Sequence, residues 1–209
     1  MNNKSILNEA LRKADNDIKY YNELMDNLFG ETFQKSMPHF DVVSFEQFKK
    51  DWMNTFDDYN DTYEDIEEIK DIYNGIKLPS RGTAYSAGYD FFSPIHFCLK
   101  PGESIMIPTG IRAYMPNNMV LKIYPRSGLG SKYQLCLANT VAVVDADYIN
   151  ADNEGDILLK LVNRGDKMVT IEKDKGIVQG VFSKYYTTHD DQADTMRIGG
   201  FGSTDNKKK

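Results

Sequence analysis

The chain has 209 residues, of which 41% are hydrophobic and 27% charged, and this composition allows a packed core in a soluble protein. The length suits one ordinary domain with an appendage, or two small domains. No apolar run approaches the roughly 18–20 residues that a membrane-spanning helix needs. The charged N-terminal stretch also lacks the pattern of a signal peptide. We therefore expect a cytoplasmic protein with no membrane association.

The net charge of −6 is unevenly distributed. Residues 1–74 contain 17 acidic and 8 basic side chains, and residues 75–209 contain 14 acidic and 17 basic ones, so the two parts carry −9 and +3. An acidic front segment argues against stable nucleic-acid binding, which requires clustered Lys and Arg. The mildly basic second part is compatible with a small anionic substrate.

The front segment is predicted to be helical. An apolar seam of period 3.5 ends before Gly30 and is formed by Leu7, Leu11, Ala14, Ile18, Tyr21, Met25 and Leu28. A second helix is predicted from Ser44, which forms a capping-box pattern with Gln47. Its apolar face comprises Phe45, Phe48, Trp52 and Phe56. A third helix is predicted over residues 62–74, with Tyr63, Ile66, Ile69 and Tyr73 on one side. We interpret these stripes as packing surfaces, and His39 as an exposed loop residue.

From Gly75 onward, short apolar runs alternate with turn residues, which is typical of an all-β sandwich or barrel. The predicted strands are 95–99, 105–107, 111–115, 119–124, 134–137, 141–144, 157–162, 168–171 and 177–182. Cys98 and Cys136 lie in such runs without metal-ligand spacing. We expect two buried thiols, with a disulfide between them as the alternative.

Two stretches in this second part point to phosphate chemistry. Pro125–Gly130 combines a guanidinium, a hydroxyl and unhindered backbone N–H groups in one predicted turn, as a phosphate oxygen requires. Asp145 and Asp147 follow an apolar strand, where a rigid carboxylate can act as a general base. A plain surface turn and an Asx-type turn explain these two stretches equally well when each is considered alone.

Two further stretches have a similar character. Asp90 follows Gly88 and Tyr89, and Arg197 precedes a Gly-rich arm that contains Phe201. Such an arm could order over a ligand, with Phe201 stacked on a base. A solvated tail is the alternative.

Together and in this order, these stretches resemble the five motifs of the homotrimeric dUTP diphosphatase family over about residues 76–205. The motifs correspond to Ala87–Asp90, Pro125–Gly130, Asn139–Tyr148, Gly176–Gln179 and Gly199–Thr204. The resemblance implies a mainly β fold, a dUTPase-type barrel or jelly-roll-like domain. We expect it to cover residues 75–196, between an acidic helical extension over 1–74 and a flexible Gly-rich arm over 197–209.

The resemblance also implies an activity, the hydrolysis of dUTP to dUMP and pyrophosphate. Asp145 would activate the water that attacks the α-phosphate, and Asp90 would orient Arg126. The implied substrate-binding residues are Ser127, Gly128, Asn139, Val143, Tyr148, Gln179, Arg197, Phe201, Gly202 and Ser203. Among them, Tyr148 would pack under the deoxyribose. Mg²⁺ would be held mainly by the substrate phosphates and water, with no protein metal site, and each active site would be shared within a homotrimer.

The chain departs from the family pattern at several positions. The turn after Tyr148 is expanded, so that Gly155 arrives only after Ile149–Glu154. Ala142 replaces a usual Gly, Gly176 replaces a usual Arg, and Asp205 replaces a terminal Gly. Arg197 lies four positions before Phe201, where the family has five.

Two other functions compete with this one. A dCTP deaminase shares the fold, but its catalytic Glu falls at Lys160 here, and its second motif has a Ser where this chain has Gly128. A regulatory module is the other alternative, with a protein partner bound through the N-terminal helices.

Overall fold

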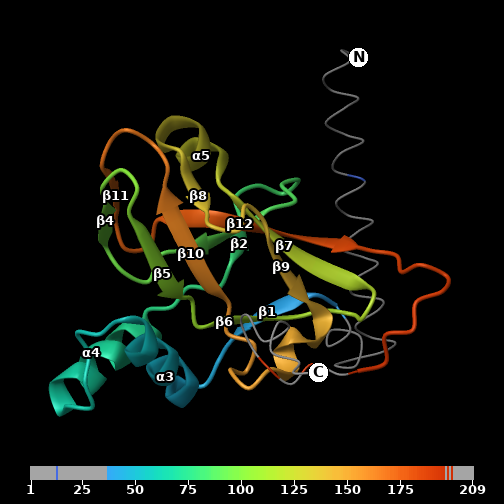
Figure 1. The fold of residues 1–209 in the computed structure, drawn as a ribbon, viewed down its shortest axis with the longest axis horizontal. Coiled ribbons are helices and arrows are strands. Elements are labelled where there is room, and N and C mark those ends of the chain that lie inside the picture. The colour runs from blue at the N-terminus through green and yellow to red at the C-terminus, as the bar shows by residue number, and fades with distance from the viewer. Residues whose placement is uncertain (1–12, 14–36, 196, 198, 200–209) are drawn as a thin grey trace. The chain divides into compact units, whose positions relative to one another are not determined.

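The computed structural model describes residue 13, residues 37–195, and residues 197 and 199 (Figure 1). The chain divides into two compact units, Met1–Pro38 and His39–Lys209. The predicted seam from Leu7 to Leu28 and the predicted site residues Phe201, Gly202 and Ser203 lie outside the described residues. Within the described ranges, no helix is long and apolar enough to cross a membrane.

The larger unit is mainly β, as predicted. Its elements in chain order are β1 (His39–Val42), α3 (Phe45–Thr55), α4 (Tyr63–Asn74), β2 (Ser80–Arg81), β3 (Tyr89–Phe92), β4 (Phe97–Leu99), β5 (Ser104–Pro108), β6 (Ile111–Tyr114), β7 (Met119–Pro125), α5 (Ser127–Tyr133), β8 (Leu135–Leu137), β9 (Ala142–Asp145), the 3₁₀ helix η1 (Ala146–Asn150), β10 (Leu158–Asn163), β11 (Val169–Ile171) and β12 (Gly176–Lys184). Each of the nine strands predicted from period and turn signals is present, with bounds that differ by at most two residues.

The strands form one five-stranded sheet and three smaller ones. The large sheet has the order β2-β3-β12-β7-β9, and its neighbouring strands are antiparallel. The smaller sheets are β5-β10-β8, β11-β4 and β1-β6. Side chains alternate between core and solvent, so that Leu159 and Leu161 of β10 are buried while Lys160 between them is exposed. The apolar faces of these sheets share one core, which holds the strand ends in place.

Two helices precede the large sheet and pack on each other at the lower left of Figure 1. The predicted cap of α3 is confirmed, because Ser44 Oγ accepts a hydrogen bond from the Gln47 N–H at 3.2 Å. The second half of the predicted capping box is wrong: Gln47 bonds Asp51 instead, and the Ser44 N–H donates to Glu154. Helix α4 is capped by Thr62, and it ends at Asn74, the last residue of the predicted range.

The buried face of α4 differs from the predicted one. Its second half supplies the buried residues Ile69 and Ile72, whereas Tyr63 in the first turn is 75% exposed. Helices α3 and α4 form a small core of their own. This core adjoins the β core through Ile76 and Ile95, which pack against both.

The compact unit begins at His39 and not at Gly75. Strand β1 pairs with β6, and the His39 ring stacks on that of Tyr114 with centroids 4.7 Å apart, so the predicted exposed loop is a strand. The Tyr73 hydroxyl also donates to the Val43 carbonyl at 2.7 Å. A four-residue strand carries too little periodicity to be recognised by sequence, and its pairing partner lies about 70 residues away.

The two cysteines are free thiols, but the prediction that both are buried is wrong. Cys98 is exposed and Cys136 is half-buried. Each lies at the middle position of a three-residue strand whose two flanking residues are buried, so the alternation of the strand turns the thiol away from the core.

Candidate active site

The first group of predicted site residues surrounds Arg126, which directly follows β7. Arg126 Nε lies 3.1 Å from Asp90 Oδ1, and Nη1 donates to the Gly176 carbonyl at 3.1 Å. A Cβ at residue 176 would lie 2.6 Å from that Nη1. Gly176, which replaces a usual Arg of the family, therefore leaves room for the guanidinium of Arg126.

Ser127 and Gly128 lie in the first turn of α5, a seven-residue helix, where the sequence predicted a turn. No side chain caps this helix, so its first N–H groups are available to an anion. Gln179 of β12 lies opposite Asp90 in the strand register and donates to the Pro125 carbonyl at 3.2 Å. The described structure thus brings Asp90, Arg126, Ser127, Gly128 and Gln179 together, and we call them the Arg126 cluster.

The second group surrounds Asp145, the last residue of β9. Its carboxylate and that of Asp147 are about half exposed, at 49% and 44%. Both pair with Arg197, at 2.5 Å from Nη2 to Asp145 Oδ2 and 3.1 Å from Nε to Asp147 Oδ1. The Arg197 guanidinium also lies 5.6 Å from the centroid of the Tyr148 ring. Arg197 was predicted to contact terminal phosphates, and in this structure it contacts the carboxylates.

Tyr148 is held by its hydroxyl group. The ring is 9% exposed, and the hydroxyl donates to the Asp156 carbonyl at 2.9 Å and accepts from Asn153 Nδ2 at 3.1 Å. Burial raises the pKa of the Tyr148 phenol, which keeps the phenol protonated as a donor. Asn153 was not predicted as a site residue, because the sequence showed only an expanded turn there.

Two predicted base-reading residues lie between the end of β8 and the middle of β9, strands that belong to different sheets. Asn139 is exposed in the turn between β8 and β9, and its carbonyl accepts from the Val141 N–H at 2.7 Å. Val143 is 60% exposed although its neighbour Val144 is buried. An exposed apolar side chain on β9, an edge strand of the large sheet, suits contact with a planar base. We call Arg197 and the three residues that it contacts, Asp145, Asp147 and Tyr148, the Asp145 cluster. Asn139 precedes β9, at the end of this strand away from Asp145, and lies outside the cluster.

The two clusters lie at opposite ends of β7. Asp145 is opposite Val120 near the start of this strand, whereas Arg126 follows its last residue, Pro125. Six residues at about 3.3 Å each separate the two ends by about 20 Å. Within one chain, therefore, Asp145 and Arg126 do not reach the same phosphate.

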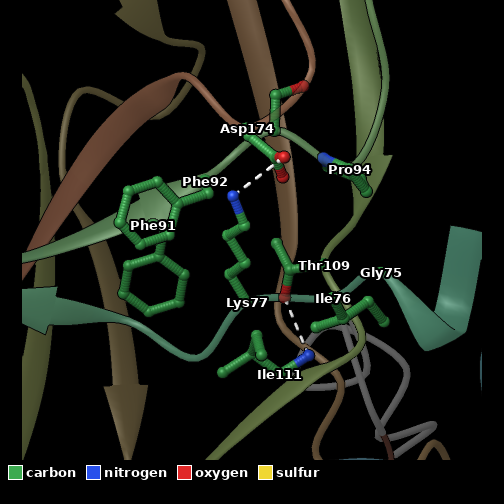
Figure 2. Close-up of a pocket in the computed structure, with 10 residues that line it drawn as sticks. Gly75, Ile76, Lys77, Phe91, Phe92, Pro94, Thr109, Ile111 and Asp174 are labelled. Atoms are coloured by element: carbon green, nitrogen blue, oxygen red, sulfur yellow. Dashed lines mark hydrogen bonds and ion pairs between the residues drawn. The ribbon is translucent and has the colours of Figure 1, made fainter.

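The pocket in Figure 2 is a separate feature. It lies between the end of α4 and the β-sheets, against Ile76 and Ile111, and the ion pair between Lys77 and Asp174 at 2.8 Å lies beside it. None of the predicted site residues lines it, so we do not assign it to the active site.

The carboxylates near Arg197 are the groups of the candidate site that could bind a metal ion. Over the residues that the structure describes, no group of three or more His, Cys, Asp or Glu side chains is arranged to hold a metal ion. Asp145 and Asp147 supply two carboxylates, and both are paired with Arg197. Mg²⁺ typically keeps several waters and binds through substrate phosphates with one or two carboxylates. The residues present fit that mode of binding and do not form a cage.

Comparisons with known proteins identify the family. The family model described as dUTPase matches residues 74–205. The deoxyuridine 5'-triphosphate nucleotidohydrolase of Lactococcus lactis subsp. lactis is 44% identical over 133 residues, which cover 62% of this chain and 89% of that protein. The corresponding protein of Rickettsia prowazekii is 37% identical over 145 residues, or 66% of this chain and 95% of that protein.

A solved structure agrees. The dUTPase from Streptococcus mutans matches with a TM-score of 0.52 and 31% identity, over 72% of this chain and 98% of that chain. The family match starts at residue 74, so β1, α3 and most of α4 precede it. Since the match covers well over half of the chain, the chain belongs to the dUTPase family.

Proposed function

We propose that this chain hydrolyses dUTP to dUMP and pyrophosphate, with Asp145 as the general base. The observation that carries the proposal is the position of Asp145. It is a half-exposed carboxylate at the end of β9, three residues before Tyr148, within the part of the chain that matches the dUTPase family. The substrate named for the relatives, deoxyuridine 5'-triphosphate, agrees with this assignment.

In the proposed reaction, Asp145 accepts a proton from a water molecule. The water oxygen forms a bond to the α-phosphorus as the bond to the bridging oxygen of the β-phosphate breaks, and pyrophosphate leaves. General-base assistance of this kind contributes about 10²–10⁴-fold to a rate. In this structure Arg197 pairs with the Asp145 carboxylate. We propose that Arg197 moves to the terminal phosphates when substrate binds, which frees the carboxylate to accept the proton.

The remaining site residues would bind and select the substrate. Arg126, Ser127, the N–H of Gly128 and Gln179 would hold phosphate oxygens through charge-assisted hydrogen bonds. Asn139 and the backbone at Val143 would read the uracil edge, and Tyr148 would pack under the deoxyribose. From the C-terminal arm, Phe201 would stack on the base, and Gly202 and Ser203 would contact phosphates.

The separation of the two clusters supports a shared site. Because Asp145 and Arg126 lie about 20 Å apart along β7, the Arg126 cluster must come from a second copy of the chain. A ring of three copies repeats one such interface and closes it. We therefore propose a homotrimer with sites between subunits.

Mg²⁺ is the proposed cofactor. When bound to the triphosphate and water, it would neutralise phosphate charge. A protein partner of the N-terminal helices is not part of the proposal, because the apolar faces of α3 and α4 are already packed in a core.

The test is release of pyrophosphate from dUTP, dCTP and dTTP by the purified chain, with and without Mg²⁺, alongside Asp145→Asn. We expect release from dUTP alone, strong dependence on Mg²⁺ and near-complete loss in the variant. Ammonia release from dCTP would support the deaminase alternative instead. Activity of Asp145→Asn equal to that of the unaltered chain would refute the assigned base.

A further inference from the structure

Two departures from the family pattern meet in this structure. One is the segment before residue 74, which includes α3, and the other is the expanded turn after Tyr148. The Ser44 N–H donates to Glu154 Oε2 at 2.8 Å, and the Ser44 hydroxyl donates to Glu154 Oε1 at 2.6 Å. These hydrogen bonds lower the pKa of the Glu154 carboxyl and keep it charged at neutral pH. Residues 110 positions apart are thus joined by two hydrogen bonds at the N-terminus of α3.

A further group strengthens this junction. Arg112 of β6 lies 3.7 Å from Glu154 Oε2 and 3.0 Å from Asp41 Oδ2 of β1. The Arg112 side chain is 24% exposed, so water screens these two contacts only in part. Glu154 is therefore held from two sides, by α3 and by β6.

The same turn holds Tyr148. Asn153 Nδ2 donates both to the Tyr148 hydroxyl at 3.1 Å and to the Asp156 carbonyl at 3.0 Å, and its Oδ1 accepts from the Gly155 N–H at 3.2 Å. Glu154 and Gly155 have φ of 55° and 79°, in the left-handed region. A Cβ at Gly155 would lie 2.9 Å from the Ile149 Cα. The turn therefore folds back tightly and aims Asn153 at Tyr148.

The end of the turn also lies near α3. Asp156 is fully buried, and its burial, together with the negative charge of Asp51 on α3, raises the pKa of the Asp156 carboxyl. Asp51 accepts a hydrogen bond from Gln47 Nε2 at 2.9 Å. Helix α3 thus borders the turn at two places: Ser44 at its N-terminus bonds Glu154, and Asp51 interacts electrostatically with Asp156.

We infer that α3 and the expanded turn act as one support that fixes the ring of Tyr148, and that this support sets the selectivity for deoxyribose over ribose. The inference rests on the proposed function, in which Tyr148 packs under the deoxyribose. A rigid ring leaves no space for a 2′-hydroxyl, and a ring released from Asn153 can shift to admit one. Ser44, Asn153 and Glu154 are positioning residues, since they act through Tyr148.

The experiment compares kcat/KM for dUTP and UTP in Ser44→Ala, Glu154→Ala and Asn153→Ser. Loss of one hydrogen bond typically corresponds to about a three- to tenfold change, and we expect the dUTP-over-UTP ratio to fall by about that factor. Glu154→Gln keeps an acceptor for Ser44 and should retain most of the ratio. The matched control is Thr62→Ala, because Thr62 caps α4 through the Asp65 N–H at 3.2 Å as Ser44 caps α3. It removes a helix cap without touching the turn.

Hydrogen exchange over residues 149–157 provides a readout that does not depend on activity. We expect faster exchange in Ser44→Ala and Glu154→Ala and unchanged exchange in Thr62→Ala. Unaltered exchange and an unaltered dUTP-over-UTP ratio in folded Glu154→Ala and Asn153→Ser would overturn the inference. An equal fall of the ratio in Thr62→Ala would do so as well, because stability alone would explain it. Failure of the unaltered chain to hydrolyse dUTP would instead refute the proposed function, and exchange would still decide whether α3 supports the turn.

Discussion

Asp145 and Arg126 lie at opposite ends of the same strand, β7, one opposite Val120 and the other just after Pro125. The proposed general base and the proposed phosphate-binding guanidinium of one chain therefore lie at different places. In the proposed homotrimer, each would act together with its counterpart from another copy. This arrangement makes the proposed active site a property of the assembly.

Subunit mixing tests that arrangement. Asp145→Asn and Arg126→Ala should each be inactive alone, because every site in either homotrimer lacks one group. After unfolding and refolding together at equal amounts, about one quarter of the interfaces should pair an intact Asp145 with an intact Arg126. We expect about that fraction of the unaltered activity in a pyrophosphate-release assay. No recovery in a refolded, trimeric mixture would place both groups in one chain's site.

Two variants distinguish proton acceptance by Asp145 from the simple loss of a carboxylate that pairs with Arg197. Asp145→Asn should lower kcat by about 10²–10⁴-fold, since the amide cannot accept the proton from water. Asp147→Asn is the matched control, because Asp147 has similar exposure and also pairs with Arg197. It should cost less than tenfold. Equal losses in both variants would indicate that the pairing with Arg197 matters and that Asp145 is not the base.

Gly176 should matter for phosphate binding more than for stability. In Gly176→Ala the new Cβ would meet the Arg126 guanidinium, the end of a flexible side chain, at 2.6 Å. The fold should tolerate this, whereas displacement of Arg126 should raise KM by about tenfold, the cost of weakening one charge-assisted hydrogen bond. Gly82→Ala is the control, because nothing lies within 4 Å of a Cβ there. Steady-state kinetics on both variants measure the change in KM, and thermal unfolding measures the change in stability.

Asp156 should make stability depend on pH. Burial, and next the negative charge of Asp51, raise the pKa of the Asp156 carboxyl well above its ordinary value of 3.8. The folded state then binds the proton more tightly than the unfolded state. The contribution of Asp156 is fully retained below about pH 3.8 and is lost as pH rises through the higher folded-state pKa.

Asp156→Asn replaces the carboxyl by a neutral amide, so stability is no longer lost through ionisation of this residue as pH rises. We expect its Tm to exceed that of the unaltered chain at pH 7.5 by at least about 2–4 °C, the shift that about 1 kcal/mol produces in a domain of this size. The difference should shrink toward pH 4. Asp156→Asn with a lower Tm at every pH would show that the carboxylate is stabilising and the argument wrong.

The cysteines should differ in reactivity. Cys98 is exposed, and its Sγ lies 3.6 Å from His96 Nε2, while His96 Nδ1 lies 3.0 Å from Glu172 Oε2. Alkylation requires that the reagent reach the thiol, so exposure favours Cys98. In native protein treated with iodoacetamide, Cys98 should be alkylated several-fold faster than the half-buried Cys136. Peptide mass spectrometry would measure both rates, and equal rates in the unfolded protein would serve as the control.

Local sequence patterns were sufficient for much of the fold. The strands from Phe97 to Lys184 follow from period-two alternation and turn residues, and the start of α3 follows from Ser44, because such signals depend only on near neighbours in the chain. The order of the five motifs was likewise sufficient to identify the family. The role of Asp145 as the base stays a prediction.

Tertiary structure alone decided the rest. Strand β1 exists because β6 offers it a partner, and Ser44 bonds Glu154 instead of completing a local capping box. The separation of Asp145 from Arg126 depends on the register of β7 with β9. Each of these features joins residues far apart in the sequence. Local propensity does not determine which distant residue becomes the contact partner. Packing of the sheets brings those groups together, and so determines that Ser44 contacts the turn after Tyr148 and that Asp145 and Arg126 lie at opposite ends of β7.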